Sequence, residues 1–313
     1  MFKKNEAFLD VGTPRRRHPC QGPYPRGMDP PNTFPGNVSV GHGSHELSVA
    51  QLLRCTILMK GPVEAFSGAH HLVLALPCQG GFLKLETTMA TFKSILFDLD
   101  GTLIDSLKDI ALSANQVLTE LGFPEHPIEA YKKFVGDGAG TLMLRILPEA
   151  VENPSLQATF LQKWKQTYGE QWQKHTCPYD GVRELLGKLK GDGYWLGVLS
   201  NKPHEFTTAC VRVLFPGFTF DTVWGLTEDR AKKPDPSAAL EMVAAWGCSP
   251  KEVLYVGDTD TDMLTAVKAG FYGLGVTWGF RSAEELMQHG ARETIDRPEQ
   301  VYWLLDERSK EGD

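Results

Sequence analysis

The sequence predicts an α/β fold in which helices cover a parallel sheet and one helical insertion interrupts it. Strand-like and helix-like segments alternate from Met89 onward, which is typical of βαβ units. Between residues 107 and 175 only helical periodicity is visible, directly after the first strand-like run. A chain of 313 residues with 42% hydrophobic residues is long enough to bury a core of this kind.

The segment before Met89 differs from the rest in composition. Its first 45 residues are rich in proline and glycine, so regular structure is hard to draw there. Basic residues exceed acidic ones in 1–88, the reverse holds from 89 onward, and the whole chain has a net charge of −7. We expect residues 1–88 to be a flexible extension or the product of a mis-assigned start, with a targeting peptide as the less favoured alternative.

Composition also excludes several classes of protein. The acidic remainder of the chain is a poor electrostatic match for nucleic acid. No uncharged apolar run is long enough to span a membrane, and the N-terminus lacks the pattern of a secretory signal. The six scattered cysteines contain no C-x-x-C pair, which favours reduced thiols. We expect a soluble cytoplasmic protein, monomeric or homodimeric, with no nucleic-acid or membrane partner.

The elements follow in order along the chain. The expected strands are Ser94–Phe97, 195–199, 222–224, 253–256 and Tyr272–Val276. The expected helices between them are 181–189, 205–214, 237–246 and 262–269. Parallel strands buried on both faces read as short apolar runs, as these do.

Polar residues stand where three of these strands end. They are Asp98 and Asp100 after the first, Ser200 and Asn201 after the second, and Asp258 to Asp262 after the fourth, with Lys233 in the loop "AKKPDP". Ligands of open α/β sheets bind outside the carboxyl ends of the strands, so these side chains should share one crevice. Carboxylates that converge repel one another unless a cation lies among them, and oxygen ligands suit Mg²⁺ together with a phosphate.

The segments "DLDGTLIDS", "LSN", "KPDP" and "GDTDTD", in this order and spacing, resemble the four motifs of the haloacid dehalogenase-like phosphohydrolases. The resemblance runs from about Phe92 to Leu305. Within that superfamily, "FVGDGAGTLM" and "GVTWGFRSAEEL" look most like phosphoglycolate phosphatases. The resemblance implies a Rossmann-like parallel sheet core formed by 89–106 and 176–313, with a helical cap domain at 107–175 inserted after the first strand.

The resemblance also implies a role for each site residue. Asp98 would be the nucleophile that forms an aspartyl-phosphate, and Asp100 the general acid and base. The substrate phosphate would be bound by Thr102, Ser200, Asn201 and Lys233. Mg²⁺ would be held by the Asp98 carboxylate, the Asp100 backbone carbonyl, Asp258 and Asp262. Within the cap, the glycine-rich break that contains Gly136 and Gly138 could turn backbone N–H groups toward a small carboxylate, or it could simply connect two helices.

The function expected from this resemblance is Mg²⁺-dependent hydrolysis of a small phosphorylated metabolite, with 2-phosphoglycolate as the first candidate. A pyrophosphatase, sugar-phosphate phosphatase or nucleotidase would share every residue named above. A phosphomutase would use the same nucleophile but would have to keep water away from the aspartyl-phosphate. A non-catalytic binding module is a different class, and its usual mark, the loss of a motif acid, is missing. Dehalogenation is disfavoured because Asp100 suits an alcohol leaving group.

Overall fold

The computed structural model describes residues 39–40, 64–68, 71–78, 81–88 and 92–310. Most of the segment that precedes residue 92, Met89 included, lies outside these residues, and the extension or mis-assigned start predicted for 1–88 stays a prediction. The structure assigns this segment an antiparallel sheet with the strand order β1-β4-β3-β2, which the sequence analysis did not anticipate. Its strands are β1 (Ser39–Val40), β2 (Glu64–Gly68), β3 (His71–Cys78) and β4 (Gly81–Thr88).

A six-stranded sheet with the order β12-β11-β10-β5-β8-β9 forms the centre of the remaining structure, and every neighbouring pair is parallel. Its strands are β5 (Ser94–Phe97), β8 (Trp195–Pro203), β9 (Thr222–Leu226), β10 (Val253–Gly257), β11 (Tyr272–Val276) and β12 (Glu293–Ile295). All five strands expected from the sequence are present, and the predicted α/β fold is confirmed. The sequence analysis missed β12, a short strand that includes Glu293 and Thr294.

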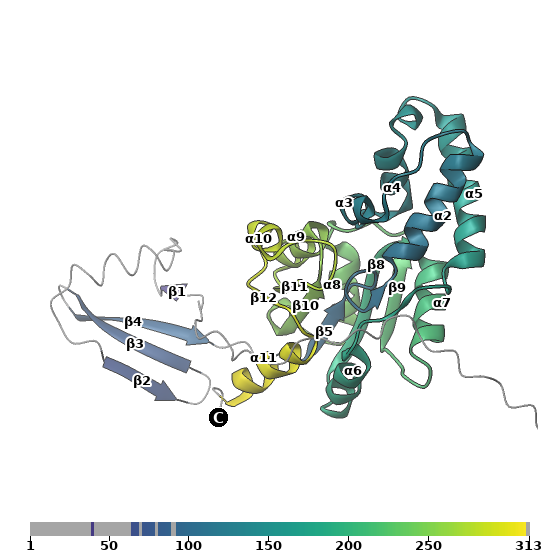
Figure 1. Cartoon of the computed structure of the whole chain (residues 1–313). Coiled ribbons are helices and arrows are strands. Elements are labelled where there is room, and N and C mark those ends of the chain that lie inside the picture. The colour runs from purple at the N-terminus through teal and green to yellow at the C-terminus, as the bar shows by residue number, and fades with distance from the viewer. Residues whose placement is uncertain (1–38, 41–63, 69–70, 79–80, 89–91, 311–313) are drawn as a thin grey trace, which may run out of the picture. The chain divides into compact units, whose positions relative to one another are not determined.

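Helices cover both faces of this sheet (Figure 1). They are α6 (Val182–Gly191), α7 (His204–Leu214), α8 (Ser237–Ala245), α9 (Asp260–Ala269), α10 (Ala283–Gln288) and α11 (Glu299–Lys310). Successive side chains of β5 point to opposite faces, so Ile95 and Phe97 pack in one apolar cluster and Leu96 in another. The first cluster includes residues of α6, α7 and α11, and the second includes residues of α8 and α9. The strand that carries the acids is therefore central and buried on both faces.

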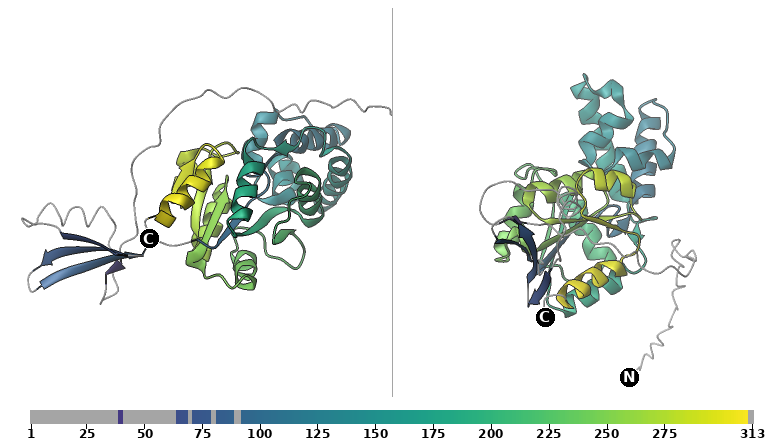
Figure 2. Two further views of the ribbon diagram at one scale, coloured as in Figure 1. Left: turned by 90° about the horizontal axis from the view of Figure 1, so that it is seen from below. Right: turned by 90° about the vertical axis from the view of Figure 1, so that its left-hand side faces the viewer.

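The stretch between β5 and β8 contains the helical insertion, which Figure 2 shows as a separate group of helices beyond one end of the six-stranded sheet. Its helices are α2 (Leu107–Glu120), α3 (Tyr131–Phe134), α4 (Gly138–Ile146) and α5 (Pro154–Gln171). Helices α2 and α5 pack together through apolar side chains such as Ile110, Val117 and Phe160. We refer to residues 107–175 as the helical insertion; its function as a cap stays a proposal.

Both ends of the insertion are tied together where the chain leaves and re-enters the sheet domain. The short strands β6 (Ile104–Asp105) and β7 (Cys177–Pro178) pair antiparallel. Asp109, in the first turn of α2, is 1% exposed and its Oδ2 accepts hydrogen bonds from the backbone N–H groups of His175 and Thr176. Because a buried carboxylate is stable only when it is hydrogen-bonded, Asp109 fixes the two connections side by side.

Two further observations bear on the expectations from composition. Cys210 and Cys248 are free and buried, as expected, whereas Cys177 is disulfide-bonded, so the expectation of reduced thiols is wrong for that residue. In the part of the chain that the structure describes, no helix is both long enough and apolar enough to cross a membrane.

Candidate active site

Asp98 and Asp100 lie directly beyond the carboxyl end of β5, at the edge of the sheet that faces the insertion. The backbone N–H of Asp98 still donates to the carbonyl of Val256, at 3.0 Å, so the first acid is held in register with β10. The chain then turns at Gly101, whose φ of +88° is unfavourable for any residue with a side chain. Both acids therefore project from one short, rigid segment, as the sequence analysis expected.

Asp258 lies against this turn from the end of β10. A Cβ atom at Gly101 would come within 2.2 Å of Asp258 Oδ2, and one at Gly279 within 2.4 Å of the same oxygen, so both glycines are needed for the carboxylate to fit. Asp258 Oδ1 accepts a hydrogen bond from Thr102 Oγ1 at 2.8 Å, and Oδ2 accepts one from the backbone N–H of Phe280 at 2.9 Å. The hydroxyl of Thr102, predicted to bind phosphate, is thus used to orient an acid.

Asp98, Asp258 and Asp262 form a buried acid cluster, with one carboxylate oxygen of each lying within 4.8 Å of the others. Burial and the neighbouring Asp262 raise the pKa of Asp98 from 3.8 to about 7, although Lys233 opposes the change. Burial, Asp262 and Asp98 likewise raise the pKa of Asp258 well above its usual value. Asp98 Oδ1 is buried and accepts no aligned hydrogen bond. Three converging buried carboxylates match the donor set that a hard divalent cation requires.

Lys233 supplies the positive charge beside this cluster. Its Nζ lies 2.8 Å from Asp98 Oδ1, as an ion pair, and donates to Asp262 Oδ1 at 2.6 Å. Burial tends to lower the pKa of Lys233, but the two carboxylates outweigh it and hold the pKa well above the usual range. Asp262 Oδ2 accepts hydrogen bonds from the backbone N–H and the hydroxyl of Thr259, which caps the N-terminus of α9. Asp262 thus lies in the cluster, as predicted, but both of its oxygens are bonded within the protein.

Asn201 and Ser200 come from the end of β8, and both are buried and line the pocket beside Asp98. The side chain of Asn201 is fully used by neighbouring loops. Its Nδ2 donates to the carbonyls of Gly136 and Lys233, both at 3.1 Å, and its Oδ1 accepts from the N–H of Lys233 at 2.9 Å. Asn201, which was predicted to bind phosphate, therefore joins the Lys233 loop to the helical insertion. Ser200 Oγ accepts a longer hydrogen bond, 3.3 Å, from the backbone N–H of Lys202.

The sequence analysis missed Lys202, the residue that follows "LSN". Its Nζ lies 2.9 and 3.0 Å from the two carboxylate oxygens of Asp100 and donates to Tyr168 Oη at 2.7 Å. Burial tends to lower the pKa of Lys202, but Asp100 and Tyr168 raise it above its usual value, so the ammonium is charged. The strand expected from the sequence ended at residue 199, whereas β8 runs to Pro203, and a charge inside a buried strand needs a buried partner.

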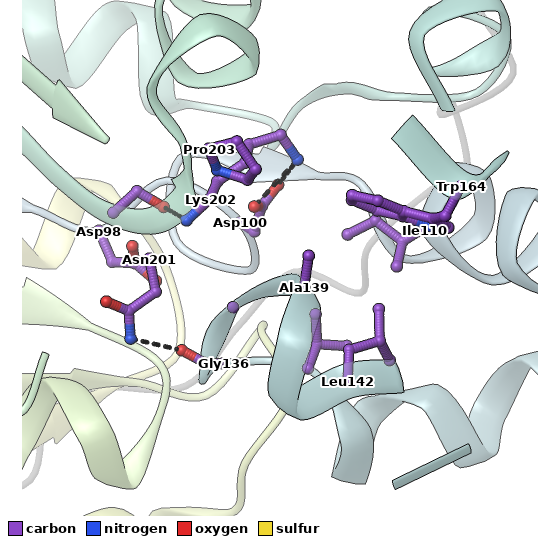
Figure 3. Close-up of a pocket in the computed structure, with 13 residues that line it drawn as sticks. Asp98, Asp100, Ile110, Gly136, Ala139, Leu142, Trp164, Asn201, Lys202 and Pro203 are labelled. Atoms are coloured by element: carbon purple, nitrogen blue, oxygen red, sulfur yellow. Dashed lines mark hydrogen bonds and ion pairs between the residues drawn. The ribbon is translucent and has the colours of Figure 1, made fainter. Parts of the chain in front are cut away.

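The helical insertion closes the other side of a pocket at Asp98 and Asp100 (Figure 3). Gly136 and Gly138, the predicted cap residues, both line it and both have positive φ, +120° and +81°. Between them, Asp137 accepts from Thr261 Oγ1 of the sheet domain at 2.8 Å and from Arg145 of α4 at 2.6 Å. The volume of the pocket is about 40 Å³, which leaves room for about three water molecules.

Comparisons with known proteins support the family resemblance that was based on the four sequence motifs. A family model described as haloacid dehalogenase-like hydrolase matches residues 95–276. The phosphoglycolate phosphatase of Aquifex aeolicus (strain VF5) is 33% identical over 212 residues, which cover 68% of this chain and 96% of that protein. The phosphoglycolate phosphatase of Pseudomonas putida is 32% identical over 206 residues, covering 64% of this chain and 75% of that protein.

A solved structure has a similar fold. The crystal structure of a predicted phosphoglycolate phosphatase from Haemophilus somnus 129pt matches with a TM-score of 0.64 and 29% sequence identity. The match covers 69% of this chain and 99% of that chain. The family match includes the strands that carry the acids as well as the helical insertion.

Proposed function

Because the chain belongs to the haloacid dehalogenase-like hydrolase family, we propose that it is a Mg²⁺-dependent phosphatase that hydrolyses a small phosphomonoester, with 2-phosphoglycolate as the first candidate. The observation that carries the proposal is the convergence of Asp98, Asp100 and Lys202 on one small pocket, with Lys233 directly behind Asp98. The relatives named phosphoglycolate phosphatase support this substrate.

In the first step, a carboxylate oxygen of Asp98 attacks phosphorus in line with the ester oxygen. The bond between phosphorus and that oxygen breaks, and Asp100 delivers a proton to the departing alkoxide. Asp98 is held for this attack by its backbone bond to Val256 and by Lys233, whose ammonium lies at 2.8 Å. The donors of Ser200 and Lys233 are close enough to the nucleophile to stabilise charge on the phosphoryl oxygens.

In the second step, a water molecule attacks the phosphorus of the aspartyl-phosphate. Asp100 accepts the proton of that water, the bond to Asp98 breaks, and inorganic phosphate leaves. Asp100 is prepared for both transfers by two fixed contacts, Ser106 Oγ at 2.5 Å and Lys202 Nζ at 2.9 Å from the same oxygen. These contacts keep the carboxylate of Asp100 pointing into the pocket between the two steps.

The acid cluster fits a magnesium ion. The residues that would hold it are Asp98 through a carboxylate oxygen, Asp100 through its backbone carbonyl, Asp258 and Asp262. Asp262 also holds Lys233, whose Nζ donates to it at 2.6 Å. A bound Mg²⁺ would neutralise charge on the phosphoryl oxygens and on the converging carboxylates.

We further propose that the helical insertion, residues 107–175, works as a cap that selects the leaving group. Ile110, Leu142 and Trp164 of the insertion line the pocket opposite the acids. The insertion thus supplies an apolar wall to the pocket, which supports a role for it in discriminating between leaving groups.

The test is an assay of purified protein with Mg²⁺ against 2-phosphoglycolate, sugar phosphates, nucleotides and pyrophosphate. We expect the highest kcat/KM for 2-phosphoglycolate and complete loss of activity with EDTA. Asp98→Asn should lower kcat by several orders of magnitude, because an amide is a poor nucleophile. Near-normal turnover in Asp98→Asn would rule out the mechanism, and a higher kcat/KM for another member of the panel would reassign the substrate.

A further inference from the structure

The pocket has one cation on the side where the leaving group would lie. In the described part of the chain, Lys202 is the only positively charged residue that lines this pocket (Figure 3). The ammonium of Lys233 is bonded to Asp98 and Asp262 instead. The wall contributed by the insertion includes Ile110, Leu142 and Trp164, which offer a carboxylate no charge.

The ammonium of Lys202 is held by Tyr168, which is itself packed between the insertion and the sheet domain. Its side chain is 3% exposed, and its ammonium lies 4.7 Å from the centre of the Tyr168 ring as well as 2.7 Å from the Tyr168 hydroxyl. Tyr168 stacks on Trp164 with 4.9 Å between ring centres and meets the edge of Phe206 at 5.1 Å. Since Tyr168 and Trp164 belong to α5 and Phe206 to α7, the ammonium is positioned by the insertion and the sheet domain together.

The position of Lys202 relative to Asp100 sets the kind of group it can meet. As general acid, Asp100 must come within about 3 Å of the ester oxygen. Lys202 Nζ is 2.9 and 3.0 Å from the oxygens of that same carboxylate, so it lies within about 6 Å of the ester oxygen. In an O–CH₂–COO⁻ group, the carboxylate stands only one carbon away from the ester oxygen. A short acid therefore reaches Lys202, whereas a neutral alkyl group gains nothing from it.

Burial makes this pairing necessary for any acidic leaving group. A carboxylate that enters an apolar pocket without a cation loses its hydration and gains no compensating bond. We propose that the ammonium of Lys202, positioned by the hydroxyl of Tyr168, forms the subsite that binds a carboxylate on the carbon next to the phosphoester oxygen, and that this contact selects 2-phosphoglycolate-like substrates. The proposal rests on the proposed function and adds a specificity-determining residue to it.

A binding measurement separates this subsite from effects on catalysis. 3-Phosphonopropanoate replaces the ester oxygen of 2-phosphoglycolate by a methylene group and cannot be hydrolysed there, and propylphosphonate has a methyl group in place of the carboxylate. With Mg²⁺ present, we expect calorimetry to show that the wild-type protein binds the first about 10- to 100-fold more tightly. Lys202→Met should abolish this preference and leave the affinity for propylphosphonate within about 3-fold.

Two further variants complete the design. Lys163→Met removes a lysine of α5 that pairs with Glu120 on the surface, and it should keep the full preference. Tyr168→Phe keeps the packed ring but removes the hydroxyl, and it should lower the preference by about 3- to 10-fold. Tyr168→Phe still tests the subsite if Lys202→Met does not fold.

The outcomes distinguish this proposal from the proposed function. If Lys202→Met binds both phosphonates less tightly by the same factor, or keeps the preference, Lys202 only positions Asp100 and the subsite is overturned, even where the wild-type protein hydrolyses 2-phosphoglycolate. A wild-type protein that binds both phosphonates equally also overturns it. A carboxylate preference in binding, combined with no hydrolysis of any phosphoester, would instead support the subsite and contradict the proposed function.

Discussion

At the scale of single residues, the site depends on charges that are buried and partly uncompensated. The pKa of Asp98 is about 7 because burial and Asp262 act against its ionisation more strongly than Lys233 favours it. Between about pH 4 and pH 7 the folded protein therefore binds more protons at Asp98 than the unfolded chain does. By linkage, the contribution of Asp98 to stability falls as pH rises through that window, and its full cost is present above about pH 7.

The raised pKa of Asp98 predicts how the stability of the metal-free protein changes with pH. In EDTA, the free energy of unfolding of the wild-type protein should fall from pH 5 to pH 7.5 relative to that of Asp98→Asn, by up to a few kcal/mol. Added Mg²⁺ should stabilise the wild-type protein more at pH 7.5 than at pH 5, because the ion binds the charged carboxylates. Urea unfolding at the two pH values measures both effects. Identical pH dependence in the two proteins would show that Asp98 ionises normally.

Lys233 carries a second prediction at this scale. Lys233→Met should abolish phosphatase activity and lower the free energy of unfolding by about 3–5 kcal/mol, because Asp98 and Asp262 would lose their buried partner. The neighbouring Lys232 is exposed, so Lys232→Met should change stability by less than about 0.5 kcal/mol. Denaturant unfolding of the two variants gives the comparison, and equal effects would argue against the buried ion pairs.

At the scale of elements, the connection into α4 is the part of the insertion that meets the acids. Gly136 and Gly138 have positive φ, and a Cβ at Gly138 would come 3.0 Å from the backbone oxygen of Asn201. The carbonyl of Gly136 also accepts a hydrogen bond from Asn201. The close approach of this loop to β8 requires glycine. A loop that only connects two helices would not need this approach.

We predict that Gly136→Val and Gly138→Val raise KM and lower kcat for 2-phosphoglycolate by about 10-fold or more, since both positions touch the pocket. An aryl phosphate has a good leaving group and should be affected much less. Gly140→Ala, in α4, is the control, because no atom lies within 4 Å of the added Cβ. Steady-state kinetics on both substrates decide the matter: equal losses on the two would mean that the loop only connects helices.

At the scale of the whole molecule, every residue of the site belongs to the part of the chain from 92 onward. In the described part of the chain, the acid cluster, Lys202, Lys233 and the pocket draw on β5, β8, β10, α9, the loop before α8 and the insertion. The described strands β1 to β4 pair with one another. None of the residues proposed for the chemistry lies in 1–88.

A protein that starts at Met89 should accordingly keep the kcat of the full chain and, under reducing conditions in which Cys177 is a free thiol in both proteins, unfold at the same Tm. Full-length and shortened proteins can be compared by thermal unfolding and by turnover of 2-phosphoglycolate under identical conditions. An insoluble or inactive shortened protein would show that residues 1–88 complete the core.

The sequence by itself determined the parallel sheet and the acids at its edge. Residues 95–97 of β5 are all apolar because both faces of a central strand are buried, and this pattern can be recognised in a short stretch of sequence. Asp98, Asp258 and Lys233 could be assigned to one crevice because the carboxyl ends of parallel strands share an edge. β12 escaped notice, since three residues that include Glu293 and Thr294 form a strand only by pairing with β11.

Only the tertiary structure decided how the polar side chains are divided among partners. Lys202 meets Asp100 across 102 positions of sequence and Tyr168 across 34, and Asn201 reaches Gly136 across 65. The sequence also did not show that the Thr102 hydroxyl donates to Asp258, or that the oxygens of Asp262 are bonded to Lys233 and Thr259. A motif fixes which groups are available, but each buried donor and acceptor is satisfied by whichever partner the packed chain brings within about 3 Å.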